Sequence, residues 1–218
     1  MQLTSQEIGR KLLHLFALLM PIGIFYGPAL HFPKLLVGIF LGTLFAGSCI
    51  VEFLRFRIPA VQKIFFVMFG SMLRKEESFK ITGSTWIIGA GFLCSILFTK
   101  EPYISFIVLS LFVLGDAAAA LVGISLGRIK IGKKSLEGSL ACFFTCIILS
   151  VAVLPLIPGL LSAWGGKMPL LIVFVTALVI TVFELVPLKI SSKIIINDNL
   201  AVPVIAGYVI LLLQKFVV

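Results

Sequence analysis

Long apolar runs limit what this chain can fold into more than any other feature of its sequence. Seven runs can be drawn, each near the ~20 residues that an α-helix needs to cross a bilayer: 9–30, 35–53, 82–99, 103–126, 139–160, 168–188 and 199–217. Hydrophobic residues make up 60% of the chain and charged residues 12%, which is outside the usual range of soluble domains. We therefore expect an all-α fold, a polytopic membrane helical bundle of about seven transmembrane helices, with residues 1–218 forming a single domain.

One further apolar stretch does not fit this pattern. Residues 56–73 are interrupted by Lys63 and Gly70, so we expect an interfacial or re-entrant amphipathic helix there rather than another span. Arg10 and Lys11 precede the first apolar run as in a signal peptide, but the run is long and further spans follow. We interpret it as an uncleaved first span.

The positive charges predict an orientation. Of the 18 lysines and arginines, 14 fall at the N-terminus and in the loops 54–81, 127–138 and 189–198, and 4 fall on the other side of the predicted bundle. Because lysine and arginine accumulate in cytoplasmic loops, we expect a cytoplasmic N-terminus and an external C-terminus. The net charge of +9 lies in loops between spans, which argues against a nucleic-acid partner.

Residues 115–139 combine three features that point to nucleotide chemistry. Asp116, Ala119, Gly123 and Gly127 are spaced to share one helical face, a carboxylate followed by a strip almost without side chains. A basic loop and a Gly-Ser pair follow, where the next apolar run begins. A carboxylate for a metal, a bare strip for a flat ligand and lysines at a helix N-terminus together predict a nucleotide-phosphate site.

Each feature alone has a plainer interpretation. Gly123-x-x-x-Gly127 is a common close-packing motif between membrane helices, and the lysines alone would mark a cytoplasmic loop. Asp116 differs, because a carboxylate inside an apolar segment is costly and by default functional.

The same residues resemble the CTP-binding signature of dolichol kinases, and are similar to that of phytol kinases and CTP-dependent diacylglycerol kinases. The signature reads Asp-x-x-Ala-x-x-x-Gly-x-x-x-Gly, a spacer, then Lys-Lys-Ser/Thr-x-Glu-Gly. The matching residues are Asp116, Ala119, Gly123, Gly127, Lys133, Lys134, Ser135, Glu137 and Gly138. The resemblance implies a CTP-dependent lipid-alcohol kinase, with CTP and Mg²⁺ bound at these positions.

Two other segments carry candidate nucleotide contacts. Arg10, Lys11 and His14 share one face of the first helix, where the family often has a similar Glu-x-x-Arg-Lys-x-x-His; a snorkelling helix start is the alternative. The segment Thr82-Gly83-Ser84-Thr85 opens a span and is either a helix N-cap or a phosphate-binding turn, and the family has a comparable Thr-Gly-x-Thr.

Further carboxylates follow near the last span. Glu184 lies inside an apolar run, and Asn197-Asp198-Asn199 opens the final helix. These groups are ordinary N-caps or an oxygen cluster for Mg²⁺. Related kinases often carry Asp-Asp-Asn here, whereas this chain has Asn197 in place of the first Asp, so a metal-binding carboxylate pair at this point is not implied.

We therefore expect a membrane enzyme that transfers the γ-phosphoryl group of CTP to a lipid alcohol, a polyprenol or phytol-like isoprenoid alcohol or a diacylglycerol, at the cytoplasmic face. Asp116, Asp198 and Glu184 are the expected Mg²⁺ ligands, and Lys133 and Lys134 the expected phosphate-neutralising cations. Asn199 is expected beside the nucleotide. Three alternatives stay open: a phosphatidate cytidylyltransferase-like enzyme, a membrane transporter and a structural membrane subunit.

Overall fold

The computed structural model describes residues 9, 14–73, 75–132, 134–186, 188–189 and 195–217. Within them the chain is almost entirely helical, with two very short antiparallel hairpins. The helices are α2 (Leu19–Tyr26), α3 (Lys34–Arg57), α4 (Pro59–Phe69), α5 (Gly83–Leu97), α6 (Pro102–Ser125), α7 (Leu136–Ile148), α8 (Leu170–Leu185) and α9 (Asp198–Val217). Short 3-10 turns occupy Phe16–Leu18, Pro28–Leu30, Gly70–Met72, Lys75–Ser78, Leu154–Leu156 and Ser162–Trp164, and Leu149–Val153 is a π-helical segment. The hairpins pair β1 (Lys130–Ile131) with β2 (Lys134–Ser135), and β3 (Leu188–Lys189) with β4 (Ile195–Ile196).

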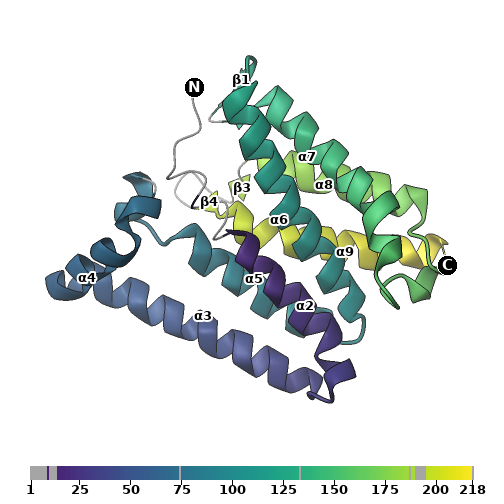
Figure 1. Cartoon of the computed structure of the whole chain (residues 1–218), viewed down its shortest axis with the longest axis horizontal. Helices are drawn as coiled ribbons and strands as arrows, with labels where there is room; N and C mark the ends of the chain where they lie inside the picture. Colours follow the sequence, from purple (N-terminus) through teal and green to yellow (C-terminus); the bar gives the residue numbers. More distant parts are fainter. Residues whose placement is uncertain are drawn as a thin grey trace.

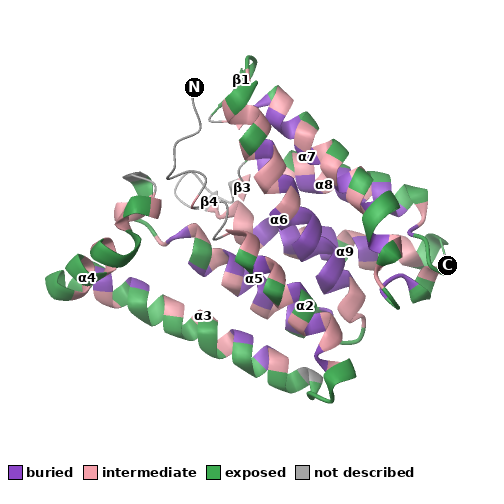
Figure 2. Ribbon diagram, viewed as in Figure 1, coloured by how far each residue is buried: buried purple, intermediate pink, exposed green. Residues whose placement is uncertain are grey.

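Helix α6 is the centre of the bundle (Figure 1). It packs against α2, α5, α7, α8 and α9, and every residue from Ile104 to Val113 is buried. Pro102 starts it at a position where a missing N–H costs nothing. Figure 2 shows its buried surface at the middle of the molecule, with the exposed residues of α3 and α4 at the periphery.

Helix α3 reaches the rest of the bundle mainly through α5. The contact depends on two glycines that each receive a ring from the other helix: a Cβ at Gly42 would lie 2.7 Å from the Phe92 ring, and one at Gly89 would lie 2.7 Å from the Phe45 ring. The two rings stack with centroids 6.2 Å apart. This interlock fixes how α3 lies along α5.

The predicted all-α fold is confirmed, but the predicted number of seven spans is wrong for the described residues. Four of the described helices are long and apolar enough to cross a membrane: Leu35–Arg57, Pro102–Ser125, Leu136–Leu156 and Asp198–Val217. Three other apolar helices, Phe16–Tyr26, Gly83–Leu97 and Leu170–Leu185, are shorter than a bilayer normally requires.

Prolines and glycines disturb the regular helix at the ends of two of the predicted spans. Pro21 cannot donate its backbone N–H, and a 3-10 turn lies just before it at Phe16–Leu18. Gly27 and Pro28 then end α2, well short of the predicted boundary at residue 30. Pro155 disturbs the end of α7 in the same way, where π-helix and 3-10 geometry replace the regular helix.

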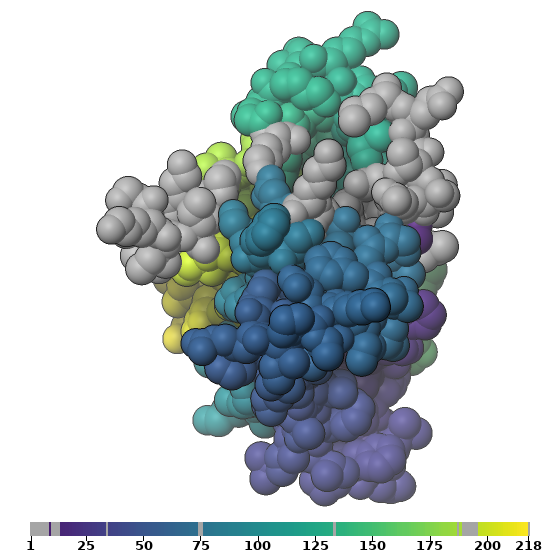
Figure 3. Space-filling model, turned by 90° about the vertical axis from the view of Figure 1, so that its left-hand side faces the viewer, coloured from purple at the N-terminus to yellow at the C-terminus, as the bar shows by residue number. Residues whose placement is uncertain are grey.

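The segment 56–73 contains a separate helix, as predicted. Ile58 is extended because the residue before a proline is disfavoured from the α region, and Pro59 then starts α4. Helix α4 packs against α3 and buries no residue completely. In Figure 3 the left-hand side of the Figure 1 view faces the reader, and α4 and the second half of α3 form the near surface of the molecule. The placement of α4 at a membrane surface stays a prediction.

Candidate functional site

Polar side chains from several segments meet beside the second half of α6, near the start of α9. Asp116 comes from the second half of α6, Lys134 from β2, Glu184 from the last turn of α8 and Asp198 from the first turn of α9. His14 lies just before the 3-10 turn that leads into α2. Ion-pair contacts divide these residues into a group of three around Lys134 and a pair formed by His14 and Asp116.

Lys134 is the centre of the first group. Its Nζ lies 2.6 Å from Oε1 of Glu184 and 3.2 Å from Oδ2 of Asp198, and it also donates to the backbone carbonyl of Glu184. Burial opposes the charged form of this amine, but the carboxylates of Glu184 and Asp198 favour it, so the pKa of Lys134 is raised above 10.5. The pairing is fully present below that pH and is lost only as pH rises through the raised pKa, so Lys134 remains a cation throughout the physiological range.

Glu184 is the most buried of these carboxylates, with only 4% of its side chain exposed. Its second oxygen, Oε2, has no hydrogen-bond partner among the described residues. Asp116 and Asp198 both interact electrostatically with Glu184. Two carboxylates, those of Glu184 and Asp198, therefore share Lys134, and the third, Asp116, acts on Glu184.

His14 and Asp116 form the second pair. Nε2 of His14 lies 3.5 Å from Oδ2 of Asp116, and the imidazole packs edge-on against Phe112 with ring centroids 6.3 Å apart. The structure thus brings His14 to the carboxylate of Asp116, one of the contacts expected of a polar stripe on the first helix. Arg10, Lys11 and Lys133, which were predicted beside them, lie outside the described residues.

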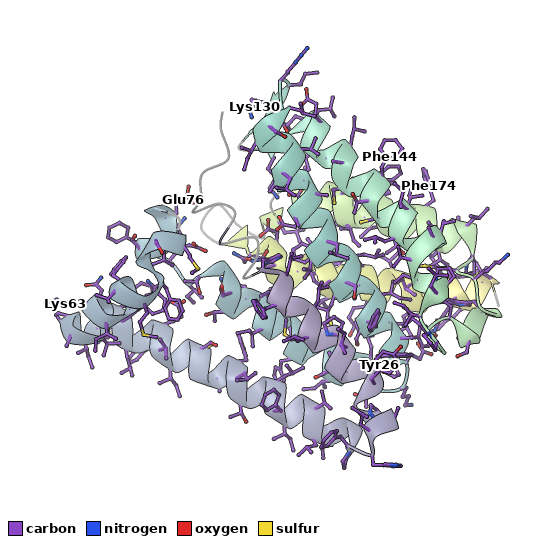
Figure 4. All side chains as sticks on the ribbon, viewed as in Figure 1. Tyr26, Lys63, Glu76, Lys130, Phe144 and Phe174 are labelled. Carbon is purple, nitrogen blue, oxygen red and sulfur yellow. The ribbon has the colours of Figure 1, made fainter. Side chains whose placement is uncertain are left out.

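An ordered hairpin, rather than an open loop, carries Lys134. Lys130 pairs with Ser135 and Ile131 with Lys134, and Gly132 makes the turn with a φ of +62°. Glu137 accepts the backbone N–H groups of Arg128 and Ile129 at 3.0 and 3.1 Å, closing the base of the hairpin. The hairpin, marked by Lys130 in Figure 4, lies at one end of the molecule. Glu137 thereby fixes the direction in which the hairpin presents Lys134.

The strip of small residues on α6 packs against the first turn of α7. Ser135 caps α7 by accepting the Gly138 N–H at 3.2 Å, and a Cβ at Gly127 would lie 2.6 Å from its Oγ. A Cβ at Gly138 would lie 2.6 Å from the carbonyl oxygen of Ala119, and one at Gly123 would lie 2.9 Å from Oγ of Ser135. The close-packing interpretation of this motif is confirmed. Protein atoms of the first turn of α7 therefore cover the strip at Gly123 and Gly127 that was predicted to receive a flat ligand.

The turn before α5 is also engaged with protein. Thr82 caps the helix, its hydroxyl accepting the N–H of Thr85, and Gly83 donates its N–H to Oε1 of Glu77 at 2.9 Å. The Gly83 carbonyl accepts Nδ2 of Asn199 at 3.0 Å, so this turn lies next to the start of α9. The helix-cap interpretation of this segment is confirmed, and Asn199 links the turn to Asp198.

Sequence reasoning missed the ion pair that holds this turn. Arg55 donates Nε to Oε2 of Glu52 at 2.6 Å and Nη2 to the carbonyls of Glu77 and Lys80 at 2.9 and 2.7 Å. Oε1 of Glu52 accepts the backbone N–H and the hydroxyl of Thr82 at 2.9 and 2.7 Å. Both Glu52 and Arg55 are buried. The available signal was the i, i+3 Glu–Arg spacing at the end of an apolar run.

The described residues contain no group of three histidine, cysteine or acidic side chains arranged to hold a metal ion. The amine of Lys134 lies between Glu184 and Asp198, two of the three predicted ligands. Magnesium sites in nucleotide enzymes commonly use one or two carboxylates plus phosphate oxygens. The unpartnered oxygen of Glu184 fits that requirement.

Comparison with known proteins gives one informative similarity. The chain is 27% identical over 201 residues to "Uncharacterized protein RP860" of Rickettsia prowazekii (strain Madrid E), and the alignment covers 90% of this chain and 89% of the relative. The similarity therefore extends over the whole bundle and is not confined to the signature at 116–138. No protein-family model and no solved structure matches the chain.

Proposed function

We propose that this protein is a membrane kinase that transfers the γ-phosphoryl group of CTP to the hydroxyl of a lipid alcohol at the cytoplasmic face. The observation that carries the proposal is the contact of Lys134, from the kinase-like signature, with Glu184 and Asp198 from two distant helices. That contact joins a signature lysine to two carboxylates, one of which, Glu184, also interacts electrostatically with the signature's own Asp116. The choice of CTP as donor rests on the resemblance of residues 116–138 to lipid-alcohol kinases.

Phosphoryl transfer needs positioned charge more than covalent chemistry from the protein. The alcohol oxygen forms a new bond to the γ-phosphorus while the bond to the β–γ bridging oxygen breaks, and CDP leaves with that electron pair. Asp116 or Asp198 accepts the hydroxyl proton. Lys134, with Lys133 from the same signature, neutralises negative charge on the transferring group.

Magnesium would be held by Glu184, Asp198 and Asp116, where it would offset charge on the β- and γ-phosphates. The buried Oε2 of Glu184, which has no hydrogen-bond partner among the described residues, supports this assignment. His14 restricts Asp116 from the opposite side at 3.5 Å, which favours one orientation of that carboxylate.

The outer surface of the bundle suits a lipid substrate. Outward-facing positions on the bundle are apolar, including Phe144 on α7 and Phe174 on α8 in Figure 4. An alcohol dissolved in the bilayer would approach the cluster sideways, along such surfaces. The bias of lysine and arginine toward the loops at this end supports a cytoplasmic site, where nucleotides are found.

The test is a transfer assay with protein purified in detergent, CTP or ATP labelled at the γ-phosphate, and separate polyprenol, phytol and diacylglycerol substrates. The proposal expects label in one of the lipids with CTP as the better donor, and transfer reduced by a factor of about 10²–10³ in Asp116→Asn. Label released as pyrophosphate would identify a cytidylyltransferase instead. No nucleotide turnover with any lipid would favour a transporter or a structural subunit.

A further inference from the structure

Lys134 occupies the place that a bound cation would take. A lysine ammonium group has three N–H donors, and the three acceptors around this amine are Oε1 of Glu184, Oδ2 of Asp198 and the Glu184 carbonyl. Two of these acceptors are carboxylates on different helices, α8 and α9. Without the positive charge of Lys134 between them, the carboxylates of Glu184 and Asp198 would repel each other.

The second oxygen of Glu184 shows that the lysine does not satisfy the site completely. This atom is buried and has no hydrogen-bond partner among the described residues, while the same side chain already binds Lys134 through Oε1. Leaving a buried acceptor without a hydrogen bond costs free energy. A divalent cation can bind both oxygens of a carboxylate or replace one contact by another, so it would use an atom that the lysine leaves free.

We propose that Lys134 is a tethered counter-ion that competes with a divalent cation for Glu184 and Asp198, and that its amine moves to nucleotide phosphate when the metal–nucleotide complex binds. The second half of this statement rests on the proposed function, whereas the competition with a metal rests on the geometry alone.

The covalent setting of Lys134 permits such an exchange. The residue lies on a short hairpin, its side chain is 32% exposed, and a flexible four-carbon stem carries the amine. Metal and nucleotide then favour each other's binding: the metal frees a cation for phosphate, and the phosphate stabilises the displaced lysine. When either ligand binds alone, the contacts of Lys134 with Glu184 and Asp198 oppose its binding.

The test measures Mn²⁺ affinity by titration with detection by electron paramagnetic resonance, on the full-length purified protein without nucleotide. Lys134→Met keeps the length of the side chain and removes its charge, so Mn²⁺ should bind roughly tenfold more tightly than to the wild type. Lys134→Arg should retain the weak wild-type affinity. Lys130→Met, in the exposed strand of the same hairpin, is the matched control and should leave the affinity unchanged.

The double variant Glu184→Gln/Lys134→Met should lose the increase in Mn²⁺ affinity that is expected of Lys134→Met alone. An unchanged or weaker Mn²⁺ affinity in Lys134→Met, or an equal gain in Lys130→Met, would overturn the proposal. This outcome can be distinguished from that of the kinase assay. A gain in Mn²⁺ affinity without any phosphoryl transfer would support the competition between Lys134 and the metal while contradicting the proposed kinase activity.

A second measurement uses the wild-type protein and does not depend on the folding of Lys134→Met. Amine acetylation followed by mass spectrometry reports how readily each lysine reacts. Mn²⁺ together with CTP should change the reactivity of Lys134, and Mn²⁺ alone at saturating concentration should increase it, while Lys130 stays constant. Equal Lys134 reactivity with and without Mn²⁺ would contradict displacement.

Discussion

At the scale of single residues, Asp116 is the carboxylate that an apolar helix has least structural reason to contain. It lies in α6, the central helix, and interacts with Glu184, a second carboxylate. Asp116→Asn removes a charge but keeps the shape. We expect phosphoryl transfer to fall by a factor of about 10²–10³, as for other lost electrostatic contacts in active sites. The thermal midpoint in detergent, measured on the same sample, separates this loss from unfolding, because the substitution also changes the contact of Asp116 with His14.

The matched control is Glu101→Gln, since Glu101 accepts Nε2 of Gln214 at 2.8 Å beside the start of α6. That substitution should leave transfer intact. Full activity in Asp116→Asn, or an equal loss in Glu101→Gln, would remove Asp116 from the proposed chemistry.

At the scale of elements, the junction of α6 and α7 depends on the absence of side chains. Gly138→Ala would bring a methyl group against the carbonyl of Ala119, which is backbone and yields little. We expect a loss of about 1–3 kcal/mol in unfolding free energy, measured by denaturant titration in micelles. Gly47→Ala on α3 is the control, because a Cβ there meets nothing within 4 Å. Equal stability of the two variants would show that α7 can shift away from α6.

The end of α3 makes a second element-scale prediction. Arg55→Met would leave Glu52 buried without its partner and would free the carbonyls of Glu77 and Lys80. Breaking a buried pair from one side typically costs about 3–5 kcal/mol, so this variant should unfold far more readily. Arg57→Met, on the exposed side of the same helix end, should change stability by less than about 0.5 kcal/mol. Similar melting of the two variants would contradict a structural role for Arg55.

These two junctions also show how far sequence reasoning reaches. The spacing of Asp116, Gly123 and Gly127 was enough to predict one helical face, because helical periodicity is local. The carbonyls that Arg55 binds lie 22 and 25 residues away, and no periodicity identifies such a partner. Two predicted helix bounds failed for a related reason: hydropathy marks an apolar run, whereas regular helix begins only at Leu19, close to Pro21, and gives way to other geometry before Pro155.

At the scale of the whole molecule, the contacts place several helix ends together. Glu52 near the end of α3 binds Thr82 before α5, Asn199 at the start of α9 binds Gly83, and Lys134 before α7 binds Glu184 at the end of α8. The proposed function requires this end to face the cytoplasm, because CTP is found there. The other end of α6, near Lys100, would then face outward.

Orientation can be tested with single cysteines in intact cells. In a Cys49→Ser background the remaining cysteines, Cys94, Cys142 and Cys146, are buried and should be silent. Lys130→Cys should react with a membrane-impermeant maleimide only after the cells are opened, and Lys100→Cys should react in intact cells, because the two positions lie at opposite ends of α6. Labelling of Lys130→Cys in intact cells would place the carboxylate cluster outside, away from cytoplasmic nucleotide. The proposed donor would then be excluded even though the geometry of the cluster remained unchanged.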